Sequence, residues 1–118
     1  MSVKPLLALA GCLLLAASAI ATAAPADGGS EARQAPSCGE WVVNREKSTT
    51  LALGNSAWLL GYLSGIAVNS KTDFLAGNEN SSLYKWMDNY CRANPLRNLS
   101  AGGNALAAEL AAKKGSGK

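Results

Sequence analysis

The stretch SSLYKWMDNYCRAN, from Ser81 to Asn94, carries the strongest helical periodicity in the sequence. Apolar residues recur at positions i, i+3, i+4, i+7 and i+8, the spacing that places side chains on one face of an α-helix. Pro95 follows directly, and a helix is expected to stop there because the residue before a proline avoids helical geometry. We therefore predict an amphipathic helix over Ser81–Asn94 with this core-facing stripe: Leu83, Trp86, Met87, Tyr90 and Cys91.

The segment AWLLGYLSGIAV, Ala57–Val68, predicts a second helix that is apolar around most of its circumference. Such a helix is expected inside a fold, and about 12 residues are too few to cross a bilayer. Gly61 and Gly65 stand on one face, where their small size would let another helix approach closely. Trp58 and Tyr62 are predicted to pack in the core, as aromatic residues usually do.

A shorter helical segment is expected nearer the N-terminus. Cys38–Arg45 predicts one or two helical turns with Trp41 facing inward, although its Trp-Val-Val run also suits a short strand. The residues that follow, Glu46–Asn55, are expected to form a polar connection, since Gly54 interrupts them.

The last predicted helix is Ser100–Lys113, whose narrow apolar face includes Leu106. Gly102 and Gly103 are expected to weaken its first turn by about 1 kcal/mol each relative to alanine. The four segments together predict an all-α fold in one small four-helix domain.

The first residues are typical of a secretory signal peptide. Lys4 provides the basic start, Leu6–Ile20 is almost entirely apolar, and Ala21-Thr22-Ala23 supplies the small residues of a cleavage site. We expect cleavage before Ala24, which removes residues 1–23. A permanent membrane anchor is a weaker interpretation because alanine dominates the segment, which falls short of about 20 strongly apolar residues.

The run Leu9-Ala10-Gly11-Cys12 offers another interpretation, because it matches a lipoprotein processing box with Cys12 as the lipidated residue. The apolar stretch before it is shorter than the roughly 7–15 residues that normally precede cleavage, so lipidation is the minority alternative. Residues 24–37 contain glycine and proline but no large apolar side chain and are expected to be a flexible leader. Residues 115–118 are the matching tail, which leaves 38–114 as the helical domain.

Removal of the signal peptide leaves two of the three cysteines, Cys38 and Cys91. An even number of cysteines in an exported protein implies a disulfide. Closing a loop of about 53 residues stabilises a fold by roughly 4 kcal/mol. Two free or metal-bound thiols are the alternative, but a metal site would lack ligands because the chain has no histidine and no third cysteine nearby.

The composition excludes several classes of function. A chain of 118 residues has room for one domain. The absence of histidine removes Ser-His-Asp triads, Cys-His dyads and histidine-ligated metal or haem sites. The net charge of +3 is small and dispersed, unlike the clustered basic face of a nucleic-acid-binding protein. We expect no cofactor, no metal and no nucleic-acid partner.

Ser82-Leu83-Tyr84-Lys85 matches the S-x-x-K motif of penicillin-recognising enzymes, but the companion motifs S-D-N and K-T-G are absent from the sequence. Ser82 is better explained as part of a helix start. We therefore expect a protein that is not an enzyme. A small cell-envelope enzyme that uses Asp88 or Ser82 is the remote alternative.

The segments Cys38-Gly39-Glu40-Trp41, Trp58–Gly65 and Tyr90–Leu96 occur in an order that resembles the HdeA/HdeB-type periplasmic acid-stress chaperones. The resemblance covers about Cys38–Lys113. It implies a small exported helical domain whose single disulfide joins the start of the first helix to the third helix. The G-Y-L-S-G stretch, the Y-x-x-x-N-P helix end and the alanine-rich last helix are also similar to the Tai/Rap immunity proteins, which share the HdeA-like fold and neutralise peptidoglycan-degrading toxins by binding them.

The resemblance implies a protein that works in the periplasm by binding other proteins, most simply as an immunity-type protein that neutralises or protects a partner. An acid-stress chaperone that suppresses aggregation at low pH is the alternative. We expect periplasmic localisation, with secretion or a lipid anchor through Cys12 as alternatives. No stable membrane span is expected in the mature form, and a homodimer is left open. Residues of the loop Asn69–Asn80 are the candidate partner contacts: Phe74, Asn78 and Asn80.

Overall fold

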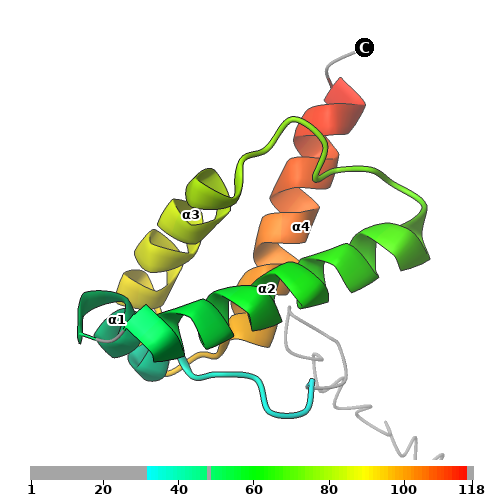
Figure 1. Ribbon diagram of the computed structural model, residues 1–118. Helices are drawn as coiled ribbons and strands as arrows, with labels where there is room; N and C mark the ends of the chain where they lie inside the picture. The colour runs from blue at the N-terminus through cyan, green and yellow to red at the C-terminus, as the bar shows by residue number, and fades with distance from the viewer. Residues whose placement is uncertain (1–31, 48, 117–118) are drawn as a thin grey trace, which may run out of the picture.

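The computed structural model describes residues 32–47 and 49–116, and this part of the chain is all-α with four helices (Figure 1). The all-α prediction is therefore confirmed. The predicted signal peptide, Cys12 and the first part of the predicted leader, residues 24–31, lie outside the described residues. The helices are α1 Cys38–Lys47, α2 Thr49–Ser70, α3 Asn80–Ala93 and α4 Leu99–Ser116.

Helix α2 is longer than the sequence predicted because it already begins at Thr49. The expected polar connection Glu46–Asn55 is wrong, since α1 runs to Lys47 and α2 starts almost at once. Gly54 lies within α2, with no heavy atom within 4 Å of the position of a Cβ. The helix continues through this glycine, which costs a helix roughly 1 kcal/mol, and Ser56 and Leu59 after it are buried in the fold.

The additional turns overturn the argument that α2 is too short to span a bilayer. Thr50–Ser70 is the one helix, among the residues that the structure describes, that is long and apolar enough to cross a membrane by length and composition. Core helices of soluble proteins and signal sequences can be equally long and apolar, so length and composition do not assign α2 to a membrane. Only 17% of this apolar segment is buried. The expectation that the fold encloses the helix on all sides is therefore wrong.

The helices enclose the core in a ring. In Figure 1, α2 crosses one side of the molecule, with α3 and α4 on its far side and α1 near its N-terminal end. The packed pairs are α1–α2, α1–α3, α2–α4 and α3–α4, so the order around the core is α1, α2, α4, α3. As a result, α2 packs against α4 although the whole of α3 separates them in the sequence.

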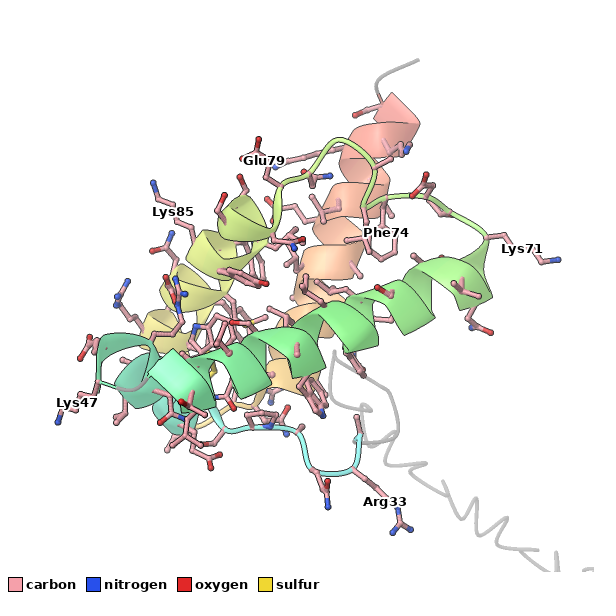
Figure 2. All side chains as sticks on the ribbon, viewed as in Figure 1. Arg33, Lys47, Lys71, Phe74, Glu79 and Lys85 are labelled. Carbon is pink, nitrogen blue, oxygen red and sulfur yellow. A yellow bond between two sulfur atoms is a disulfide. The ribbon has the colours of Figure 1, made fainter. Side chains whose placement is uncertain are left out.

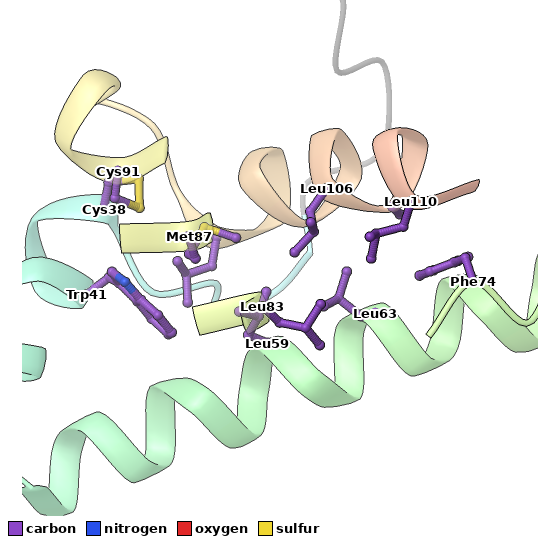
Figure 3. Packing of buried hydrophobic residues seen from close by; sticks show 12 residues of the cluster. Cys38, Trp41, Leu59, Leu63, Phe74, Leu83, Met87, Cys91, Leu106 and Leu110 are labelled. Atoms are coloured by element: carbon purple, nitrogen blue, oxygen red, sulfur yellow. A yellow bond between two sulfur atoms is a disulfide. The ribbon is translucent and has the colours of Figure 1, made fainter. Parts of the chain in front are cut away.

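The core lies between the four helices (Figure 3). Four of the residues expected there are buried: Trp41, Leu83, Met87 and Leu106. Four aromatic residues expected there are half-buried: Trp58, Tyr62, Trp86 and Tyr90. They form two stacked pairs, Trp58–Tyr62 and Trp86–Tyr90, with ring centroids 5.1 and 5.4 Å apart. These four aromatic residues therefore cover the edge of the core, while Trp41, Phe74, Met87 and aliphatic side chains fill it.

Gly102 and Gly103 of α4 lie close against side chains of the neighbouring helices. A Cβ on Gly102 would lie 2.6 Å from Sδ of Met87, and a Cβ on Gly103 would lie 2.7 Å from Cδ1 of Tyr62. These glycines, expected only to weaken α4, thus allow it to pack against α3 and α2. The two glycines of α2 that were expected to admit another helix are exposed instead, with no heavy atom within 4 Å of a Cβ position: Gly61 and Gly65.

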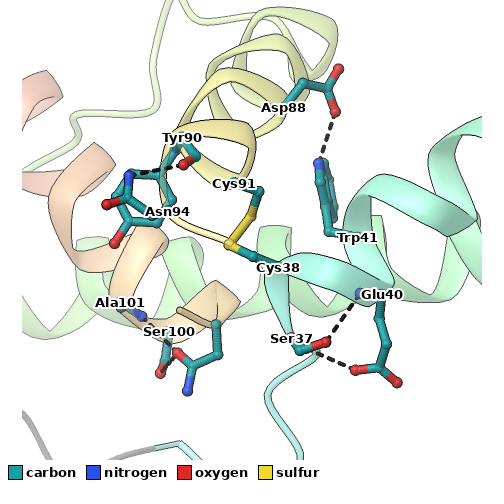
Figure 4. Close-up of a disulfide and its surroundings, with 11 residues drawn as sticks. Ser37, Cys38, Glu40, Trp41, Asp88, Tyr90, Cys91, Asn94, Ser100 and Ala101 are labelled. Atoms are coloured by element: carbon teal, nitrogen blue, oxygen red, sulfur yellow. Dashed lines mark hydrogen bonds between the residues drawn. A yellow bond between two sulfur atoms is a disulfide. The ribbon is translucent and has the colours of Figure 1, made fainter. Parts of the chain in front are cut away.

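A disulfide joins Cys38, the first residue of α1, to Cys91 near the end of α3, and the Cα atoms are 4.8 Å apart (Figure 4). The predicted disulfide is confirmed. The alternative of a short strand after Cys38 is wrong, because Ser37 and Glu40 form a capping box at the start of α1. The Glu40 N–H donates to Ser37 Oγ at 3.0 Å, and the Ser37 N–H donates to Glu40 Oε2 at 2.8 Å.

Two backbone hydrogen bonds show where the packed domain begins. The Leu99 N–H donates to the Pro36 carbonyl at 2.9 Å, and the Cys38 N–H donates to the Arg97 carbonyl at 2.9 Å. These bonds attach the residues just before α1 to the turn that leads into α4. The packed domain therefore starts near Pro36, inside the predicted leader, and α4 continues to Ser116, inside the predicted tail.

Candidate functional site

A groove lies between the C-terminal half of α2 and α4. The two helices touch near Gly103 and then diverge, and the loop after α2 bridges the space between them (Figure 1). The groove has a volume of about 280 Å³ and is open to solvent on one side. Its lining comes from α2, from the loop and from α4: Ile66, Ser70, Thr72, Phe74, Asn104, Ala107, Ala108 and Ala111.

The groove exists because α4 presents alanines where α2 is furthest from it. Ala107, Ala108 and Ala111 are too short to reach across to Ile66. Phe74 closes the base of the space and is only 2% exposed; Figures 2 and 3 show its ring directed inward from the loop. A larger apolar residue on α4 would fill the groove, as Leu106 and Leu110 fill the neighbouring core.

The loop that forms one wall is held in place by hydrogen bonds to its backbone. Asn78 Nδ2 donates to the Phe74 carbonyl at 2.9 Å, and Lys114 Nζ of α4 donates to the Asp73 carbonyl. Gly77 has φ of 81°, a left-handed conformation that glycine adopts without steric cost, and it turns the chain toward α3. These contacts therefore stabilise the conformation of the loop and attach it to α4.

The groove is apolar inside and polar at its edge. The Ser70 hydroxyl donates to the Ala67 carbonyl at 3.3 Å, and the Thr72 hydroxyl donates to the Ser70 carbonyl at 3.4 Å. The Tyr62 hydroxyl donates to Asn104 Oδ1 at 2.8 Å. The hydroxyl groups are thus engaged as donors to oxygen atoms of the chain, and each can still accept a hydrogen bond from a ligand.

The three predicted partner-contact residues do not form one surface. Phe74 is buried rather than exposed, so its expected role as a free contact is replaced by a role as the floor of the groove. Asn78 is exposed, but its side-chain amide already donates a hydrogen bond to the Phe74 carbonyl of the loop. Asn80 is exposed at the first residue of α3. Sequence analysis missed the alanine side of the groove, because alanine spacing on α4 does not reveal how far away the facing helix is.

Asp88 and Ser82, the two residues considered for catalysis, have positions that a structural role explains. Asp88 Oδ1 accepts a hydrogen bond from Trp41 Nε1 at 2.8 Å (Figure 4). It also accepts one from Arg45 Nε at 3.0 Å, and Oδ2 accepts one from Arg45 Nη2 at 3.0 Å. This contact raises the pKa of the Arg45 guanidinium. Ser82 is exposed in the first turn of α3, and Lys85, one turn further along the helix, is also exposed. Asp88 therefore joins α3 to α1.

The groove and the disulfide define the class of molecule as a small, disulfide-linked, all-α domain with an open apolar groove. Within residues 32–47 and 49–116, no group of three histidine, cysteine, aspartate or glutamate side chains is placed to hold a metal ion. Comparison of the chain with protein-family models, curated proteins and solved structures gave no match.

Proposed function

We propose that this protein is an exported, non-catalytic binding protein that holds a partner protein through the groove between α2 and α4. The groove carries the proposal, because it is an open, largely apolar surface framed by polar groups. Its 280 Å³ is just below the range of about 300–1,000 Å³ typical of small-molecule pockets. An apolar side chain projecting from a partner would fill it, and the hydroxyl and amide groups at its edge would orient the partner backbone.

The disulfide supports an oxidising compartment, since such bonds persist in the periplasm and outside the cell. We propose the periplasm, reached through the predicted signal peptide, with secretion or a lipid anchor at Cys12 as alternatives. The arrangement expected from the HdeA-like resemblance, a disulfide from the first helix to the third, agrees with the Cys38–Cys91 bond. Within that resemblance, an immunity-type protein that neutralises or protects one partner fits a preformed groove best.

Affinity capture from a cell-envelope extract at pH 7 tests the proposal. Ala108 lines the groove and is exposed, so Ala108→Leu should fill the groove without disturbing the core. Ala112 is also an exposed alanine of α4, but it does not line the groove, so Ala112→Leu is the matched control. We expect the wild type and Ala112→Leu to retain one stoichiometric partner and Ala108→Leu to lose it. No partner for the wild type, or equal capture by both variants, would refute the proposal.

An acid-stress chaperone is the second candidate, and the contacts of α1 favour it. Glu40 holds the start of α1, and Asp88 holds Arg45 of the same helix against α3. Loss of the Glu40 charge in acid would weaken the start of α1, because hydrogen bonds to Ser37 lower the pKa of this carboxyl group. Capture repeated at pH 3 distinguishes the two functions. Many client proteins bound only in acid would indicate the chaperone, whereas one partner bound at pH 7 would indicate the immunity-type protein.

A further inference from the structure

Trp58 of α2 differs from the other two tryptophans in its hydrogen bonding. Trp41 Nε1 donates to the carboxylate of Asp88. Trp86 Nε1 likewise donates to the carboxylate of Glu109. Trp58 is half-buried, and no described residue accepts a hydrogen bond from its Nε1. An indole nitrogen can only donate, so Trp58 offers a donor to a molecule outside the described part of the fold.

The neighbours of Trp58 on the helix support its ring on one face and leave space beside it. Residues three and four positions away are the nearest on a helix surface. Here they are Gly54, Asn55, Gly61 and Tyr62. Tyr62 stacks on the indole, with ring centroids 5.1 Å apart and planes inclined by 11°, and therefore holds the ring in place. Gly54 and Gly61 have no heavy atom within 4 Å of a Cβ position, so they do not obstruct the approach to the indole.

The remaining neighbour, Asn55, has an unpaired donor of its own. Its Nδ2 atom is the one buried side-chain nitrogen or oxygen in residues 32–47 and 49–116 that lacks a hydrogen-bond partner. Buried polar groups are normally paired, because an unpaired one costs free energy. Asn55 precedes Trp58 by three residues, so the two donors come from neighbouring positions on one side of α2. We call this group of side chains the indole platform: Asn55, Trp58 and Tyr62.

The chemistry of the indole platform selects its ligand. Both unpaired groups are neutral N–H donors, so the ligand must supply oxygen acceptors. Helix α2 carries no charged residue, and an ionic ligand therefore finds no opposite charge on it. The flat indole suits a ring that presents C–H groups on one face, and a pyranose sugar combines such a face with oxygen atoms around its rim. A peptide segment would also bring N–H donors, which these two donors cannot satisfy.

We infer that the indole platform binds a neutral pyranose sugar of the N-acetylhexosamine type. The C–H face of the sugar ring lies on Trp58. The acetamido carbonyl oxygen, which has two lone pairs, accepts hydrogen bonds from Trp58 Nε1 and Asn55 Nδ2. None of the three platform residues lines the groove between α2 and α4, so sugar binding is a further activity at a separate site.

An NMR titration of the exported protein with chitotetraose, a chain of four N-acetylglucosamine units, tests this inference. With the disulfide intact and ¹⁵N-labelled tryptophan, the three tryptophans give three indole N–H signals. We expect the Trp58 signal to shift with a dissociation constant of about 0.1–10 mM, while the Trp41 and Trp86 signals stay in place. An unmoved Trp58 signal at about 20 mM sugar, or equal shifts of all three signals, would overturn the inference.

Substitution of Asn55 separates sugar binding from folding. Asn55→Ala removes a buried unpaired N–H group, so the melting temperature should be unchanged or higher. The dissociation constant for chitotetraose should nevertheless rise by at least about 10-fold. Asn89→Ala is the matched control, because Asn89 is an exposed asparagine of α3, and this variant should bind like the wild type. Equal sugar affinity of Asn55→Ala and the wild type would contradict the assigned site.

The protein partner captured at pH 7 provides the other comparison. If this partner shifts the Trp58 signal and chitotetraose does not, the indole platform belongs to the protein interface and the sugar inference is wrong. Partner capture is measured separately from the sugar titration. Failure of the groove proposal therefore leaves the result of the sugar titration unaffected, and the two failures can be told apart.

Discussion

Gly102 and Gly103 of α4 lie directly against side chains of α3 and α2. A Cβ at Gly102 would be 2.6 Å from Met87 Sδ, a distance at which something must move. Sequence analysis treated both residues only as weak helix formers, because helix propensity contains no information about neighbours. Gly54 and Gly61 of α2, in contrast, face open space, so an added side chain would meet no neighbour there.

This difference predicts opposite effects of adding one methyl group. Gly102→Ala should lower the free energy of unfolding by about 1–3 kcal/mol, because Met87 or the helix must shift to make room. Gly54→Ala should raise it by up to about 1 kcal/mol, since alanine favours a helix and meets no neighbour. Urea unfolding of both variants, with the disulfide intact, checks this. Equal effects of the two substitutions would show that the packing of α4 is not as described.

At the scale of helices, the sequence predicted which residues form α3 far better than it predicted α2. The α3 stripe alternates with polar residues, so its period is visible, and the helix ends where Pro95 requires. In α2 the polar and small residues before Ala57 resemble a loop in the sequence, yet they are helical. The groove could not be predicted, since it depends on the angle between α2 and α4 and on the inward position of Phe74.

The start of α1 makes a prediction about acid. Hydrogen bonds from Ser37 lower the pKa of the Glu40 carboxyl group below its ordinary value; the bond from the Ser37 backbone N–H contributes most and the Ser37 side chain less. A carboxyl group whose pKa is lower in the folded state stabilises the fold above its unfolded pKa, and this contribution is lost as the pH falls through the folded pKa.

Glu40→Gln can keep the capping box but removes the charge. We therefore expect the wild type to be more stable than this variant at pH 7 and the two stabilities to converge as the pH falls through the lowered pKa of Glu40. Denaturant unfolding across pH 2–7 measures the difference. A gap that stays constant over this range would contradict the assigned role of the Glu40 carboxylate.

At the scale of the whole molecule, the disulfide closes the ring of helices where α1 meets α3. Cys38 and Cys91 are separated by 53 residues, a span that includes all of α2. Loop closure of this size stabilises a fold by roughly 4 kcal/mol, a large share of the about 5–15 kcal/mol available to a domain. The count of cysteines sufficed to predict this bond, whereas the helix packing around it required the structure.

Replacing both cysteines with alanine should lower the free energy of unfolding by about 3–5 kcal/mol. Circular dichroism during thermal unfolding of the variant, beside the oxidised and the chemically reduced wild type, provides the measurement. We expect the variant and the reduced wild type to melt together, well below the oxidised protein. Identical melting of the oxidised and reduced wild type would contradict the stabilising role of the bond.

The most direct test of binding through the groove is a methyl NMR titration. Ile66 lines the groove and is the only isoleucine that remains after removal of residues 1–23, so combined isoleucine and valine methyl labelling of the exported protein gives a single isoleucine signal. Addition of the captured partner at pH 7 should shift the Ile66 methyl signal much more than the methyl signals of the exposed Val43 on α1. Partner binding that shifts Val43 but leaves Ile66 unchanged would contradict the proposed binding site.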